Sequence, residues 1–410
     1  MRIKQFNSQA DTCARAFAIA LGFTIPISVA LDNILLALIL AAWLASGNFR
    51  DKLATIKTSP VALAALMLFG LLVLGLAYGM RNPGDGMRYA GKYVDLLFVP
   101  VLLTLFQDQR TREAGLKAFG CAILLSLIVS HLAHNGLLIN NPLLPREQDV
   151  SGGFKYSITH SLLAGFAAFA FALLAREATR RAWRIGLVGL VLITAHNVVF
   201  MIMSRTGYLV FALLMLYFFV VTFRRRGVAM AAALGIVLFC AAYAGSDTFY
   251  QRVNSVVTEM SDWQPGKPTD TSIGLRMEFY RNSLQIVREH PILGAGTGSF
   301  PAAYAATVSG KPLEATSNPH NEYLLIASQI GLVGLAFLIV LFCRQWRCAG
   351  RLAQPLYRDL ARGLVLMFAV GCLFNSLLVD HTEGLLFAWM TALLFAAPVA
   401  ADAAPPGPAA

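Results

Sequence analysis

Three side chains in the second half of the chain could bind an anion and move a proton: Arg205, Arg276 and His320. Arginine guanidinium groups bind phosphate through paired N–H donors. Histidine has a pKa near neutrality and can accept a proton from a hydroxyl group. If the three side chains converge, they suit the transfer of a group from a phosphate leaving group to a hydroxyl.

Arg276 lies in a predicted amphipathic helix, Leu275–His290, which Pro291 ends. When residues are placed at about 100° per position, Arg276 falls inside the apolar arc of this helix. A charge facing an apolar contact is costly unless it is paired, so Arg276 requires either a protein carboxylate or a bound anion. Arg281 and Arg288 fall on the polar face and are expected to be solvated.

His320 belongs to the segment Pro319-His320-Asn321-Glu322, directly before an apolar run that starts at Tyr323. Helix N-termini favour anions and disfavour an imidazolium ion. This position predicts a histidine that is neutral near pH 7 and can act as a base. The alternative is a histidine that caps the helix or packs at an interface.

Arg205 lies in Ser204-Arg205-Thr206-Gly207, a short break between two apolar runs at the predicted outer membrane boundary. An arginine that reaches the headgroups is the alternative interpretation. Arg88 and Lys92 are weaker candidates that share one helix face, because they are four residues apart. Asp380 could pair with an arginine or orient a histidine.

The elements that must position these residues are membrane helices. The chain has 410 residues, of which 57% are hydrophobic and 13% charged, and its mean hydropathy is +0.63. A bilayer core needs about 20 apolar residues per helix. Twelve spans are predicted, near Phe17–Leu31, Asn33–Ala45, Val61–Met80, Val94–Leu105, Ala118–Leu138, Ser157–Ala175, Ile185–Met203, Tyr208–Phe223, Val228–Ala244, Tyr323–Cys343, Leu364–Val379 and Leu385–Val399.

The charge distribution predicts the orientation of these spans. With both termini in the cytoplasm, 21 of the 33 basic residues fall in inner segments, as the positive-inside rule requires. The net charge of +11 is therefore a topology signal, and nucleic acid is not an expected partner. The predicted domains are helices 1–9 (1–244), an outer loop with amphipathic helices (245–322), helices 10–12 (323–400) and a disordered cytoplasmic tail (401–410).

Several absences restrict the function. The chain has no Walker A motif, which argues against ATP hydrolysis, and its six cysteines form no C-x-x-C pair, which argues against zinc. No Asp-x-Asp or Glu-x-Asp pair follows the first predicted span, although metal-dependent lipid-linked sugar transferases usually carry one there. The glycine-rich segment Gly294–Phe300 follows a helix, so it is not a nucleotide-binding fingerprint. We therefore expect no metal and no cofactor.

The sequence resembles the O-antigen ligase and polymerase family of bacterial membrane proteins. The resemblance rests on many spans, one long late outer loop and three motifs. The motifs are Ser204-Arg205-Thr206-Gly207, the segment from Arg276 to His290-Pro291-Ile-Leu-Gly-Ala-Gly296, and His320-Asn321-Glu322-Tyr323-Leu324 leading into Ile330-Gly331-Leu332-Val333-Gly334. Together they cover about a third of the chain.

The resemblance implies an all-α polytopic membrane protein of about 12 transmembrane helices, similar to GT-C glycosyltransferases. It implies a metal-independent O-antigen ligase in the bacterial inner membrane that moves a glycan from undecaprenyl pyrophosphate to lipid A–core oligosaccharide on the periplasmic face. By analogy, His320 is the base, and Arg205 and Arg276 hold the pyrophosphate with help from Arg88 and Lys92. Attack from the opposite face would invert the anomeric carbon, and Asp380 would orient His320.

Two further interpretations stay open within the family, an O-antigen polymerase and a protein O-oligosaccharyltransferase. The single large outer loop favours the ligase, because the polymerases often have two. A transporter of lipid-linked oligosaccharides is the alternative from another class. It would require a basic, water-filled path through the membrane, whereas the candidate residues lie at the outer boundary.

Overall fold

The computed structural model describes residues 2–79, 83–138 and 152–399, and these ranges form helices without any strand. The N-terminal half contains α1 (Arg2–Thr24), α2 (Val29–Ala45), α3 (Phe49–Thr58), α4 (Pro60–Leu74), the 3₁₀ turn η1 (Gly75–Ala77), α5 (Pro83–Lys92), α6 (Asp95–Leu105), α7 (Gln109–His134), α8 (Ser157–Glu177) and α9 (Arg181–His196). The C-terminal half contains the π-helical turn η3 (Asn197–Met201), α10 (Arg205–Phe223), α11 (Arg225–Gly245), α12 (Asp247–Asp262), α13 (Ser272–Glu289), α14 (Phe300–Val308), α15 (Glu322–Ala349), α16 (Pro355–Gly371) and α17 (His381–Phe395). The predicted all-α class is confirmed.

Seven helices in the described ranges are long and apolar enough to cross a membrane on their own. They are α4 with η1, α7, α8, α9 with η3, α10, α11 and α15. The other five predicted spans overlap α1, α2, α6, α16 and α17, which are shorter or more polar. The first of them, Phe17–Leu31, was misplaced, because α1 runs from Arg2 to Thr24 and α2 begins at Val29. The chain is therefore a polytopic membrane protein, while the count of twelve spans stays a prediction.

The helices start where the sequence provides capping side chains. Ser59, Ser204, Thr271 and Asn321 each accept a hydrogen bond from a backbone N–H in the first turn of α4, α10, α13 and α15. The last three of these caps stand directly before the helices on which the candidate site is built.

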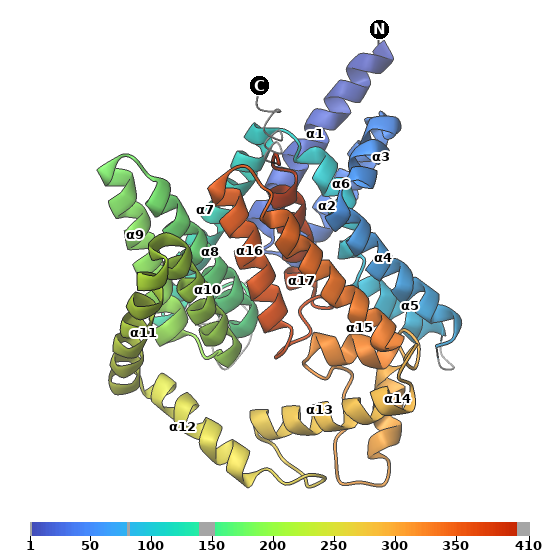
Figure 1. Ribbon diagram of the computed structural model, residues 1–410, viewed down its shortest axis with the longest axis vertical. Coiled ribbons are helices and arrows are strands. Elements are labelled where there is room, and N and C mark those ends of the chain that lie inside the picture. The colour runs from blue at the N-terminus through green and yellow to red at the C-terminus, as the bar shows by residue number, and fades with distance from the viewer. Residues whose placement is uncertain (1, 80–82, 139–151, 400–410) are drawn as a thin grey trace, which may run out of the picture.

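The core lies around α17, whose residues from Thr382 to Leu394 are all buried. The Trp389 indole donates to the carbonyl oxygen of Ala18 in α1 over 2.7 Å. A Cβ atom at Gly22 would lie 2.3 Å from that indole, so glycine lets α1 approach α17 closely, as small residues do in membrane bundles. Figure 1 shows α16 and α17 in the middle of the molecule and α9, α10 and α11 at one side.

The two ends of the bundle differ in character. The N-terminal end of α1 lies at one end, and α12, α13 and α14 lie at the opposite end (Figure 1). Leu352 in the predicted inner loop before α16 forms an isolated bridge with Val399. Arg112, in another predicted inner segment, donates to the carbonyl oxygen of Ala396 over 3.3 Å. The predicted inner segments therefore gather at the end of the bundle away from α12–α14.

Helix α15 is broken inside the membrane segment, because Ile330 and Gly331 have non-helical backbone angles and Gly331 has φ +68°. The glycine-rich segment after α13 fills this break. Ala295 N–H donates to the Ser328 carbonyl over 2.9 Å, and Gly296 N–H donates to the Gln329 carbonyl over 2.8 Å. Broken helices are tolerated in membranes where protein satisfies the freed backbone groups, and this segment supplies that protein.

The same segment reaches a second helix end. Thr297 donates from its hydroxyl to the Leu72 carbonyl over 2.6 Å and from its backbone N–H to the Gly75 carbonyl over 3.0 Å. Gly296 and Gly298 both have positive φ, and a Cβ atom at Gly296 would lie 2.1 Å from the Cα of Gly79. The glycines therefore allow the chain to insert between the end of α4 and the break in α15, and a nucleotide is not needed to explain them.

Candidate active site

Arg205 is the first residue of α10, and its motif fixes that position. The Ser204 hydroxyl accepts from the Gly207 N–H over 3.0 Å and so caps the helix. A Cβ atom at Gly207 would lie 2.2 Å from the Ser161 hydroxyl on α8, so only glycine permits this packing. The Ser-Arg-Thr-Gly motif is therefore a capped helix start pressed against α8, with Arg205 at the end facing α12.

The Arg205 guanidinium is paired with Glu259 of α12, a partner that the sequence did not predict. Its Nη2 lies 2.6 Å from Glu259 Oε1 and 2.6 Å from the Ser255 hydroxyl, and its Nη1 lies 3.3 Å from Glu259 Oε2. Glu259 Oε2 also accepts from the Ile273 N–H at the start of α13 over 2.9 Å. Burial opposes ionisation of Glu259, but the hydrogen bonds from Arg205 and Ile273 hold its pKa below the usual value.

Arg276 is partly buried on α13. The buried face of this helix differs from the predicted apolar arc, because Glu278 and Asn282 are buried while Met277 and Leu284 are exposed. Within the described ranges its guanidinium has no hydrogen bond and no ion pair. Burial lowers its pKa, and nearby Arg205 lowers it further, while Tyr280 and Glu259 act in the opposite direction. Because arginine stays protonated in proteins, the region around Arg205 and Arg276 holds two cations against one carboxylate.

His320 lies at a sharp turn with φ +53°, directly before the Asn321 cap of α15. Its backbone N–H donates to Asn318 Oδ1 over 2.8 Å, and its ring stacks on Phe279 with the centroids 6.1 Å apart. Its Nδ1 lies 3.2 Å from Asn375 Oδ1. Since an amide oxygen only accepts, Nδ1 carries the proton, and Nε2 keeps its lone pair with no hydrogen-bond partner among the described residues.

The imidazole is held in its neutral form. Burial lowers the pKa of His320, Arg276 lowers it further, and only the hydrogen bond with Asn375 acts to raise it. The sequence predicted a neutral histidine from the field of a helix N-terminus; the structure assigns the effect to burial and to a neighbouring cation. Arg276 thus acts electrostatically on both Arg205 and His320, and the structure brings all three predicted residues together.

Tyr280 connects α13 to the backbone of His320 and to the turn after α16, and it was not among the site residues predicted from the sequence. Its hydroxyl donates to the Leu373 carbonyl over 2.8 Å and to the His320 carbonyl over 3.2 Å. It lies one helical turn after Arg276 on α13, which places both side chains on one face. The spacing of four residues was the signal available in the sequence.

Glu322 anchors the motif that carries His320. Its two carboxylate oxygens accept from the Tyr93 hydroxyl over 2.6 Å and from the Leu378 N–H over 2.9 Å. Its backbone N–H donates to the Cys372 carbonyl over 2.9 Å. The start of α15 is therefore tied to the α5–α6 junction and to the segment between α16 and α17, which holds Asn375.

Asp380 does not have the predicted place beside His320. It is an exposed residue at the start of α17 with Lys92 as its electrostatic neighbour, and Asn375 occupies the position next to the imidazole. The reason is that Leu373–Val379 forms turns instead of continuing the predicted span, which presents Asn375 and not Asp380 to the ring.

Arg88 and Lys92 lie on α5, beside the site and not among its three central residues. The Lys92 ammonium lies 4.9 Å from the centroid of the Tyr89 ring, and the Tyr89 hydroxyl donates to the Ser317 carbonyl. Arg88 is exposed on the same helix. Helix α5 therefore contacts the segment that leads to His320, three residues before it.

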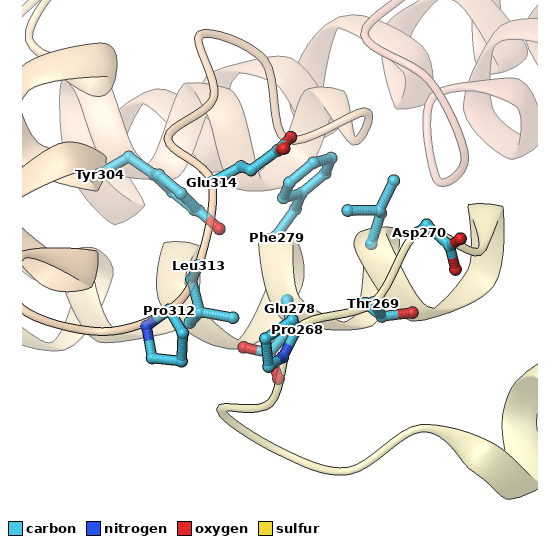
Figure 2. Close-up of a pocket in the computed structure, with 10 residues that line it drawn as sticks. Pro268, Thr269, Asp270, Glu278, Phe279, Tyr304, Pro312, Leu313 and Glu314 are labelled. Atoms are coloured by element: carbon cyan, nitrogen blue, oxygen red, sulfur yellow. The ribbon is translucent and has the colours of Figure 1, made fainter.

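A pocket of about 400 Å³ shares a wall with the imidazole. It opens between α13, α14, the segment that follows α14 and the segment that precedes α13, and Figure 2 shows Phe279, Tyr304 and Leu313 around it. Asp270, Glu278 and Glu314 add carboxylates, and none of its lining residues is basic. The volume is in the range of small-ligand pockets, and Phe279 separates the pocket from His320.

The fold and site thus define a polytopic, all-helical membrane protein with a neutral histidine and two arginines at the end of its bundle that carries α12–α14. Residues 189–339 match the model of the O-antigen ligase family. The match includes Arg205, Arg276 and His320 but ends before Asp380 and begins after Arg88 and Lys92. Over these residues the predicted resemblance is confirmed, because this part of the chain is similar to the O-antigen ligase family. No curated protein matches the chain.

Proposed function

We propose that this protein is an O-antigen ligase, which transfers a glycan from undecaprenyl pyrophosphate to a sugar hydroxyl of lipid A–core oligosaccharide. The reaction takes place on the periplasmic face of the bacterial inner membrane and requires no metal. The observation that carries the proposal is a neutral imidazole with a free Nε2 beside Arg276, a partly buried cation that has no hydrogen bond or ion pair among the described residues. A base next to a guanidinium that can bind an anion suits displacement of a pyrophosphate.

The chemistry follows from the positions of these groups. His320 Nε2 removes the proton from the acceptor hydroxyl as its oxygen attacks the anomeric carbon of the donor. The bond between that carbon and the pyrophosphate oxygen breaks, and the negative charge left on the pyrophosphate is stabilised by Arg276 and Arg205. Attack from the face opposite the leaving group inverts the anomeric carbon.

The remaining contacts have supporting roles. Asn375 holds the Nδ1 proton, so that the lone pair on Nε2 points toward the acceptor. Glu259 occupies Arg205 in this structure, so the pyrophosphate competes with it for that guanidinium. The pocket beside Phe279 is placed to hold a sugar of the acceptor, because aromatic and carboxylate groups bind the apolar faces and hydroxyls of sugar rings.

The test is reconstitution of the purified protein with an undecaprenyl-pyrophosphate-linked glycan and purified lipid A–core. We expect glycan on lipid A–core, no effect of EDTA, and loss of transfer in His320→Ala. Lengthened donor instead would identify a polymerase, and movement of intact donor across the bilayer without a new glycosidic bond would identify a transporter. Transfer at the wild-type rate by His320→Ala would refute the role of the base.

A further inference from the structure

A second pocket lies at the end of the bundle opposite to His320, at the C-terminal end of α10, whose first residue is Arg205. It has a volume of about 630 Å³ and lies between the C-terminal ends of α8 and α10 and the start of α16. Four arginines line it, namely Arg176, Arg224, Arg358 and Arg362, against two carboxylates, Glu177 and Asp359. These residues belong to the predicted inner segments, where a bilayer presents its anionic leaflet.

The two carboxylates are used mainly by one arginine. Arg176 Nη2 lies 2.9 Å from Asp359 and 3.4 Å from Glu177. Arg358 approaches Asp359 only to 3.5 Å through its Nε. Asp359 is 4% exposed, so its charge is directed to these partners and away from the open part of the pocket.

The other two arginines have no carboxylate partner within the described part of the chain. The Arg362 guanidinium lies 5.1 Å from the centroid of the Trp346 ring, and its Nε is buried without a hydrogen-bond partner. The hydroxyl of Thr222, which also lines the pocket, is buried without a partner. Buried donors of this kind are costly when unpaired, and a phosphate group with several acceptor oxygens would satisfy them.

One wall of the pocket is apolar. Val220 and Val221 in the last turns of α10 line it, and Val220 is 36% exposed. A free phosphate or a nucleotide has no acyl chain to pack against such a wall. A phospholipid has both a phosphate and acyl chains, and the chains can follow α10 into the bilayer.

We propose that this pocket binds the headgroup of an anionic phospholipid of the inner leaflet, with its phosphate on Arg224 and Arg362 and its acyl chains along Val220 and Val221. The site is independent of glycan transfer, since its residues lie at the opposite ends of α8 and α10 from the candidate active site. Bound lipid would brace the packing of α8, α10 and α16, and α10 carries Arg205 at its other end.

Lipid binding to the purified full-length protein, measured by native mass spectrometry and by thermal shift with added cardiolipin, phosphatidylglycerol or phosphatidylcholine, tests this proposal. The double variant Arg224→Gln/Arg362→Gln should bind anionic lipid about 30-fold more weakly, because each arginine near an anionic lipid contributes about 1 kcal/mol and 1.4 kcal/mol is tenfold. The matched control is Arg344→Gln/Arg347→Gln, which removes two exposed arginines from the same side and should change binding less than twofold.

A second variant guards against misfolding. Thr222→Trp fills the pocket while keeping all four arginines, and it should also abolish the preference for anionic lipid. Equal losses in both arginine double variants, equal binding of phosphatidylcholine, or full competition by millimolar inorganic phosphate would each overturn the proposal.

Discussion

The ion pair between Glu259 and Arg205 leads to a prediction in which the loss of a contact improves donor binding. Under the proposed function the donor pyrophosphate must compete with Glu259 for the Arg205 guanidinium. Glu259→Gln removes the competing charge, while the amide oxygen can still accept from the Ile273 N–H that Glu259 now binds. We therefore expect this loss of an ion pair to strengthen donor binding.

The magnitude follows from the geometry. The closest atoms of the pair are 2.6 Å apart and its side chains are 20% and 13% exposed. Unit charges about 4 Å apart attract by about 4 kcal/mol at an effective dielectric constant of about 20. Glutamine at position 259 keeps part of this attraction through hydrogen bonds to Arg205, and solvent screens another part. We therefore expect the substitution to favour donor binding by about 1.4 kcal/mol, which corresponds to a tenfold lower KM for the donor.

The assay is the initial rate of transfer over a range of donor concentrations at saturating acceptor, with the melting temperature measured in parallel. Glu289→Gln is the matched control, because Glu289 is an exposed carboxylate at the end of α13 whose side chain accepts, among the described residues, only from Gln285. A raised donor KM or a reduced kcat in Glu259→Gln, at an unchanged melting temperature, would refute competition and show that Glu259 holds Arg205 in place.

Three further predictions concern the base and the packing beneath it. Arg276→Gln removes a cation that lowers the pKa of His320, so the pKa of the imidazole should rise. The acidic limb of the profile of kcat/KM against pH should then move to higher pH, and an unchanged acidic limb would contradict this. Asn375→Ala leaves Nδ1 without its acceptor and should lower kcat by roughly tenfold with the donor KM unchanged, whereas a change confined to the donor KM would argue against an orienting role. Gly331→Ala places a Cβ atom 2.0 Å from the Ile292 carbonyl oxygen at φ +68° and should reduce the free energy of unfolding by more than about 1 kcal/mol; Gly235→Ala, where nothing lies within 4 Å of a Cβ atom, is the control, and equal melting temperatures would contradict the reasoning.

The periodicity of the sequence predicted α13 well. The predicted helix Leu275–His290 corresponds to Ser272–Glu289. The predicted apolar arc was less accurate, because Glu278 and Asn282 are buried while Met277 and Leu284 are exposed. Each predicted span overlaps a helix. Such features depend on local composition and on side chains three or four residues apart, which a single sequence displays.

The partners across the site could not be predicted in the same way. Glu259 meets Arg205 only because α12 crosses the end of the bundle, and Asn375 meets His320 because the chain between α16 and α17 forms turns. Asn375, and not the predicted Asp380, therefore lies next to the imidazole. Long-range packing decides which residue reaches the ring.

The seat of the glycine-rich segment in the break of α15 limits how this protein can be recombined with its relatives. Residues 245–322 look like an exchangeable insert between two spans, yet Ala295 and Gly296 complete the backbone hydrogen bonding of Ser328 and Gln329. A chimera that swaps the insert alone would combine a glycine-rich segment from one protein with the broken α15 of another, and these backbone hydrogen bonds would no longer match. Specificity grafts between ligases and polymerases should therefore move residues 245–331 as one unit, so that Gly331 travels with Ile292 and Leu293, against which it packs.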